Sequence, residues 1–119
     1  MHSTTTTDLS IIQRNLTGNI DDRRQKVVLI STGALNPVHR AHITNLIRVK
    51  QHLEKDHGFH VVAGYLSPTH DAYVRHKLRR EFIPGNHRIH MCRLAIKEAN
   101  QEHWLGVDEA ECSGMNSYG

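Results

Sequence analysis

Two histidines stand close to a glycine and an Asn-Pro pair in the stretch from Gly33 to His42. His39 and His42 are three residues apart, so on a helix their side chains share one face. Imidazole N–H groups donate hydrogen bonds to phosphate oxygens, and a protonated ring adds positive charge. Gly33 lets a phosphate or ribose approach the backbone closely. The combination favours a phosphate-binding site; because the chain has 11 histidines, two ordinary surface residues are the alternative.

The flanking sequence predicts elements that would hold these residues between a strand and a helix. Residues 27–30 form a continuous apolar run, which is typical of a buried strand in a parallel sheet. Asn36 is a suitable N-cap and Pro37 a suitable first helical residue, and apolar spacings of three and four predict a helix over 38–55. A helix start presents N–H groups and positive partial charge, so the turn predicts an anion site.

The rest of the chain predicts two more strands and a second helix. Residues 61–66 predict a strand, 67–86 a long basic loop and 104–107 a short third strand, while Asn86 caps a helix that runs to about 100. The β-α-β-α-β order predicts an α/β fold with a Rossmann-like parallel sheet and right-handed crossovers, which is half of a doubly wound nucleotide-binding fold.

The domain organisation follows from this pattern. We expect residues 1–25 to form a disordered or poorly ordered tail, because Thr4–Thr7 is of low complexity and turn-forming residues follow it. Residues 26–119 then form one domain, which we expect to be truncated at its carboxyl end because the second half of the fold does not follow.

Composition excludes several classes of protein. A chain of 119 residues with 38% hydrophobic and 23% charged residues is not collagen, coiled coil or fully disordered, and no apolar run approaches the ~20 residues of a membrane span. A net charge of +3 favours anionic partners. Two cysteines cannot build a disulfide scaffold, and the first residues lack the apolar segment of a secretory signal. We therefore expect a cytosolic or nuclear location.

The stretch from Gly33 to His42 resembles the H-x-G-H signature of the nucleotidyltransferases, in the form found in nicotinamide or nicotinate mononucleotide adenylyltransferases. Three later segments resemble the same family in the same order. They are Ser67–Tyr73 for its S-P-x-x-D-A-Y segment, Ile83–Ile89 for its I-P-x-x-H-R helix start, and Val107-Asp108 with Glu111 for its V-D-x-W-E. The resemblance covers nearly all of the expected domain and implies the amino-terminal half of a nucleotidyltransferase fold.

The resemblance also implies a reaction and a set of site residues. The reaction is adenylyl transfer from ATP, with Mg²⁺, to nicotinamide or nicotinate mononucleotide, which gives NAD or deamido-NAD and pyrophosphate. His42 would hold the ATP phosphates as a catalytic residue, with His39 flanking it. The nucleotide-binding residues that the resemblance implies are Gly33, Ala34, Asn36, His39, His42, Tyr73, Arg75 and Lys77. We expect no nucleic-acid partner, because few aromatic residues are interleaved in the basic stretch after Tyr73, and no membrane partner. A homo-oligomer stays open.

The chain departs from that family at several positions. Leu35 stands where the family usually has Phe, Ala41 occupies the third position of the H-x-G-H signature, and Ala110 replaces the tryptophan of V-D-x-W-E. Only Ser117 and Tyr118 lie where a nicotinamide-stacking tryptophan is usual, and the I-S-S-T-x-x-R motif does not occur. The alternatives are another enzyme with this turn, such as a pantetheine-phosphate adenylyltransferase or a cytidylyltransferase, and a non-catalytic nucleotide-binding fragment.

Further candidate residues have simpler interpretations. The spacing of His87, His90, Cys92 and Cys112 fits no common zinc signature, so no metal site is expected. Cys92 and Trp104 are expected in the core, and His87 and Arg88 are expected to line the cleft or to contact solvent. The basic run after Tyr73 is either a phosphate-binding segment or a solvated loop.

Overall fold

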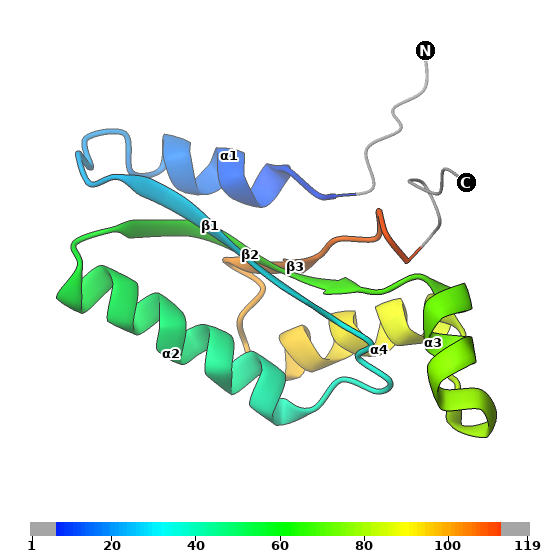
Figure 1. The fold of residues 1–119 in the computed structure, drawn as a ribbon. Helices are drawn as coiled ribbons and strands as arrows, with labels where there is room; N and C mark the ends of the chain where they lie inside the picture. Colours follow the sequence, from blue (N-terminus) through cyan, green and yellow to red (C-terminus); the bar gives the residue numbers. More distant parts are fainter. Residues whose placement is uncertain (1–6, 113–119) are drawn as a thin grey trace, which may run out of the picture.

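A three-stranded parallel sheet lies at the centre of the computed structural model, which describes residues 7–112 (Figure 1). Its strands are β1 (Lys26–Gly33), β2 (His60–Pro68) and β3 (Leu105–Val107), in the order β1-β2-β3. The helices are α1 (Ser10–Thr17), α2 (Arg40–Asp56), α3 (Asp71–Leu78) and α4 (Gly85–Glu98), and the short 3-10 helix η1 (Arg79–Glu81) follows α3. The predicted α/β class and its three parallel strands are confirmed.

The main core lies between the sheet and the two long helices. Figure 1 shows α2 and α4 on one face of the sheet and α1 on the other. Every residue of β2 is buried, because β2 is the middle strand and is covered on both faces. Ile43 of α2, Ile89 of α4 and the ring of Trp104 belong to one buried cluster, which confirms the expected core position of Trp104. This packing fixes where the carboxyl ends of β1 and β2 meet the two helices.

Strand β1 differs from the buried strand that its apolar run predicts. Among residues 7–112 it pairs with β2 alone, so it is an edge strand, and exposed and half-buried positions alternate along it. Val27 and Leu29 pack against the core, whereas Val28 and Ile30 on the other face are 40% and 63% exposed. A continuous apolar run does not specify how many neighbouring elements pack against a strand, and here the face that carries Val28 and Ile30 is exposed.

The chain before β1 also differs from the expected tail. Helix α1 lies across β2, where the side chain of Ile11 is 4% exposed and clusters with Tyr65. Asn15 anchors the helix through a hydrogen bond of 2.8 Å from Nδ2 to the carbonyl of Val62, and the Tyr65 hydroxyl donates to the carbonyl of Asp8 at 2.6 Å. A few apolar side chains and two partly buried hydrogen bonds therefore hold this segment on the sheet.

The predicted basic loop contains regular structure as well. Helix α3 begins after His70, whose Nδ1 accepts a hydrogen bond of 3.0 Å from the Ala72 N–H, and its Val74 side chain is fully buried. Pro84, not Asn86, occupies the N-cap position of α4, so Asn86 lies inside the first turn. The burial of Val74 thus favours a helix in a segment whose charged residues predicted a loop.

Candidate functional site

The candidate site is the corner between β1 and α2, made of residues 33–42. Gly33 ends β1, and its carbonyl accepts a hydrogen bond of 3.0 Å from the Thr69 N–H just beyond the end of β2. The corner therefore lies at the carboxyl ends of two adjacent parallel strands, which is where ligands bind in open α/β sheets. A Cβ built on Gly33 would meet no atom within 4 Å, so the backbone is open at this point.

His39 and His42 are brought together at the start of α2, although His39 precedes the helix and does not lie in its first turn as expected. The N-cap of α2 is His39, not Asn36 as expected, and Pro37 precedes the helix instead of starting it. The main-chain N–H of His39 donates to Nδ1 of His42 at 2.8 Å, and the two rings stack with centroids 5.7 Å apart at 15°. Because Nδ1 of His42 accepts, the proton of the neutral ring resides on Nε2. His42 thus presents an N–H donor at the positive end of the helix.

Asn36 connects the corner to a distant segment instead of capping α2. Its Nδ2 donates to the carbonyl of Glu81 at 2.6 Å, and its Oδ1 accepts from the N–H of Ile83 at 2.7 Å. One side chain thereby satisfies two backbone groups of the segment between α3 and α4. This link places α3 and η1 beside the corner.

Arg88 is a structural residue of the site that sequence reasoning missed. Its side chain is fully buried, whereas a position in the cleft or in solvent was expected. Nη1 donates to the carbonyl of Ala34 at 2.8 Å, Nε to the carbonyl of Ile83 at 2.8 Å, and Nη2 to the Asp71 carboxylate at 2.6 Å. The signal in the sequence was its position four residues before the core residue Cys92, on the same face of one helix.

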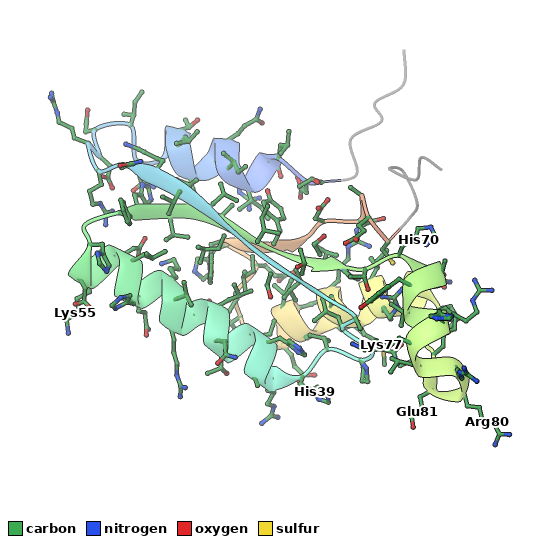
Figure 2. All side chains as sticks on the ribbon, in the orientation of Figure 1. His39, Lys55, His70, Lys77, Arg80 and Glu81 are labelled. Carbon is green, nitrogen blue, oxygen red and sulfur yellow. The ribbon has the colours of Figure 1, made fainter. Side chains whose placement is uncertain are left out.

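The basic residues of the predicted site lie on one short helix near the corner. Tyr73 is 58% exposed, and Arg75 lies over the ring of Phe82 with its guanidinium carbon 5.5 Å from the centroid. In the view of Figure 2, Lys77 projects from α3 toward the corner and Arg80 projects away from it. Within residues 7–112, no hydrogen bond or ion pair joins Tyr73, Arg75 or Lys77 to the two histidines. These side chains face solvent and are available to an anion.

The four residues weighed for a zinc site differ in their exposure to solvent. His87 and His90 are exposed on α4, whereas Cys92 and Cys112 are buried. Burial raises the pKa of the Cys92 thiol to about 12, so the thiolate that would bind a metal is disfavoured. Among residues 7–112, no group of three or more His, Cys, Asp or Glu is placed to hold a metal ion.

The segment after β3 closes the same end of the sheet. Asp108 accepts hydrogen bonds from the Ser67 hydroxyl at 3.3 Å and from the Thr7 hydroxyl, so its carboxylate joins the ends of β2 and β3. Ser117 and Tyr118, which stand where the resembled family usually has a nicotinamide-stacking tryptophan, lie outside the described residues. None of the helices within residues 7–112 has the length and apolar character that a bilayer crossing requires.

The corner offers donors and positive charge, which suit the binding of phosphate groups. Polar donors fixed before the ligand arrives stabilise a charge that develops on phosphate oxygens, because they need no reorganisation during the reaction. Transfer at phosphorus needs such positioning more than it needs a protein nucleophile. The geometry therefore suits phosphate binding and charge stabilisation.

Comparison with known proteins gives consistent matches. The family model described as cytidylyltransferase-like matches residues 30–114. The nicotinamide/nicotinic acid mononucleotide adenylyltransferase 2 of Danio rerio is 34% identical over 92 residues, which cover 77% of this chain and 28% of the relative. For the protein of the same name in Xenopus tropicalis the identity is 35% over 86 residues, with 72% and 26% covered.

A plant relative is similar to a longer part of the chain. The nicotinamide/nicotinic acid mononucleotide adenylyltransferase of Arabidopsis thaliana is 31% identical over 99 residues, which cover 83% of this chain and 38% of the relative. The chain thus spans about a quarter of the length of the two vertebrate relatives and less than two fifths of the plant one. These similarities confirm the resemblance that the motifs indicated.

Proposed function

Because this chain belongs to the cytidylyltransferase-like family, we propose that it takes part in adenylyl transfer from ATP to nicotinamide or nicotinate mononucleotide. An oxygen of the mononucleotide 5′-phosphate attacks the α-phosphorus of ATP, and the bond from that phosphorus to the bridging oxygen breaks. The products are NAD, or deamido-NAD, and pyrophosphate. The matched relatives carry this activity in their names.

The observation that carries the proposal is the orientation of His42. Its Nδ1 is occupied by the His39 N–H, so its Nε2–H is free to donate to an α- or β-phosphate oxygen. His39 stacks on it and flanks the same phosphates. An interaction of this kind, when it is stronger in the transition state, is worth roughly 10²–10³ in rate.

The remaining site residues take supporting roles. Gly33 and Ala34 contact the nucleotide through the backbone, and Asn36 holds the turn against the segment after η1. Tyr73, Arg75 and Lys77 on α3 meet the phosphate of the mononucleotide. ATP enters as its Mg²⁺ complex, since Mg²⁺ is usually carried by substrate phosphates and water. We propose a cytosolic or nuclear location, which the two free cysteines favour because thiols stay reduced in these compartments.

The test combines binding and turnover of the chain. Calorimetry measures the affinity for MgATP, and a coupled assay measures NAD formed from nicotinamide mononucleotide, with pantetheine phosphate as the competing acceptor. The proposal predicts that MgATP binds and that turnover, where it occurs, requires the mononucleotide. Turnover with pantetheine phosphate instead would assign another nucleotidyltransferase activity. Binding without any turnover would favour the non-catalytic nucleotide-binding alternative, and absence of binding would contradict both.

A further inference from the structure

Three polar side chains form a group at the carboxyl end of α2, at the far end of that helix from the corner. Figure 2 labels Lys55 at this end of α2 and His39 at the other. Here Nε2 of His57 lies 3.2 Å from Nε2 of His52, and Nδ1 of His52 lies 2.7 Å from the Asp56 carboxylate. The proposed adenylyl transfer uses none of these side chains.

The carboxylate fixes the protonation of His52. A carboxylate only accepts hydrogen bonds, so Nδ1 of the neutral His52 ring carries the proton and its Nε2 has a free lone pair. In the absence of a ligand, His57 donates its Nε2–H to that lone pair. A carboxylate behind an imidazole is the arrangement that orients histidines which bind metal ions and raises their basicity.

The distance between the two nitrogens matches the requirement of a single ion. Zinc binds imidazole nitrogen at about 2.0–2.1 Å with tetrahedral angles, so two such nitrogens lie about 3.3–3.4 Å apart. The observed 3.2 Å is close to that separation. The ring centroids are 4.9 Å apart at 78°, so the two nitrogens, and not the ring faces, make the closest approach.

His57 is held in place by contacts of its own. It is the C-cap residue of α2, and its ring stacks on Phe59 with centroids 6.2 Å apart at 18°. The N–H of Phe59 donates to the carbonyl of Leu53 at 3.1 Å, so the connection to β2 is folded back onto the helix. An ion between the two imidazoles would join the last turn of α2 to this connection.

We propose that His52 and His57 form a two-histidine site for a divalent transition-metal ion such as Zn²⁺, with Asp56 orienting His52. The ion replaces the proton between the two nitrogens. This proton passes through solvent to Nδ1 of His57, so that the ring stays neutral, and water fills the remaining coordination positions. Both histidines are exposed, so the ion enters directly from solvent. The site stabilises the folded chain, because an ion that binds only the native pair of nitrogens favours the native state.

The experiment is a titration of the ¹⁵N-labelled chain with ZnCl₂ at pH 7.5, where imidazole is ordinarily neutral. Long-range correlations of the histidine ring nitrogens report which rings bind, and thermal unfolding reports stabilisation. We expect the ring signals of His52 and His57 to shift first, up to one equivalent of Zn²⁺, together with a rise in Tm.

Variants separate this site from the other histidines of the chain. His57→Ala should lower the affinity at least about tenfold and remove the rise in Tm, and Asp56→Asn should lower the affinity roughly tenfold. The double variant His87→Ala/His90→Ala removes two exposed histidines three residues apart on α4 and should bind as the unchanged chain does. Equal affinity in His57→Ala, or first shifts at other rings, would overturn the proposal. Neither outcome depends on nucleotide binding.

Discussion

Arg88 donates a hydrogen bond of 2.8 Å to the carbonyl of Ala34, a residue 54 positions earlier in the chain. The same guanidinium reaches the carbonyl of Ile83 and the Asp71 carboxylate. One buried side chain therefore joins the corner after β1, the start of α3 and the segment before α4. The candidate site is assembled around a cation that belongs to the core and not to the ligand-binding surface.

Removing this cation should destabilise the protein strongly. Arg88→Met leaves two carbonyls and a carboxylate without their partner, and we expect a loss of about 3 kcal/mol in the free energy of unfolding. Arg93 is the matched control, because it pairs with Glu109 at an exposed position. Arg93→Met should cost less than ~0.5 kcal/mol. Urea unfolding of both variants gives the comparison, and similar losses would contradict the role of Arg88.

Gly33→Ala tests whether the backbone at the corner is open for a ligand. The added Cβ meets no atom within 4 Å, so the free energy of unfolding should change by less than ~0.5 kcal/mol. If nucleotide lies against this backbone, the affinity for MgATP should fall at least about tenfold. Gly64→Ala is the opposite case, since its Cβ would meet the Trp104 ring at 2.6 Å and should destabilise the fold. Unchanged MgATP affinity in Gly33→Ala would mean that the nucleotide does not lie against this backbone.

The position of α1 on the sheet can be tested with two isoleucines. Ile11 is 4% exposed and Ile20, just after the helix, is 81% exposed. Ile11→Ala should lower the free energy of unfolding by about 2–4 kcal/mol, because it leaves a cavity against Tyr65, whereas Ile20→Ala should have almost no effect. Chemical denaturation measures both. Equal, small effects would mean that α1 contributes nothing to the packing.

Burial of Cys92 predicts a loss of stability at alkaline pH. Its thiol has a pKa raised from the ordinary value near 9 to about 12 by burial. The folded state therefore binds this proton more tightly than the unfolded state does. The stability that the protonated thiol adds to the folded state is complete below pH 9. It is lost as the pH rises toward 12, by about 1.4 kcal/mol per pH unit. Unfolding between pH 8 and 10 under reducing conditions should show a shallower decline for Cys92→Ala than for the unchanged chain. Parallel declines would contradict this origin.

The sequence predicts the elements whose signals are local. The strands stand out as apolar runs. The two histidines meet because an N-cap residue and the third residue of the helix are neighbours at a helix start, where the His39 N–H bonds to Nδ1 of His42. The cap of α2 was assigned wrongly to Asn36, whose amide bonds to backbone 45 and 47 residues away. A partner at that distance leaves no trace in the neighbouring sequence.

The features that were predicted wrongly depend on tertiary packing. Helix α3 is ordered by the burial of Val74 in a segment that is otherwise basic, and the exposed face of β1 reflects which neighbours the strand has. Arg88 was expected to line the cleft or to contact solvent, whereas its side chain is buried and its hydrogen-bond partners come from three other segments. Such long-range partners are set by the assembled fold.

The most direct test of the site compares two ligands in one variant. Calorimetry of the unchanged chain and of His42→Ala should be done with MgATP and with adenosine, and His90→Ala serves as the control on an exposed helix face. If Nε2 of His42 holds phosphate oxygens, His42→Ala lowers the MgATP affinity at least about tenfold, leaves the adenosine affinity unchanged and keeps the fold. Equal MgATP affinity in the two proteins, or an equal loss for both ligands, would contradict a phosphate-binding role for this corner.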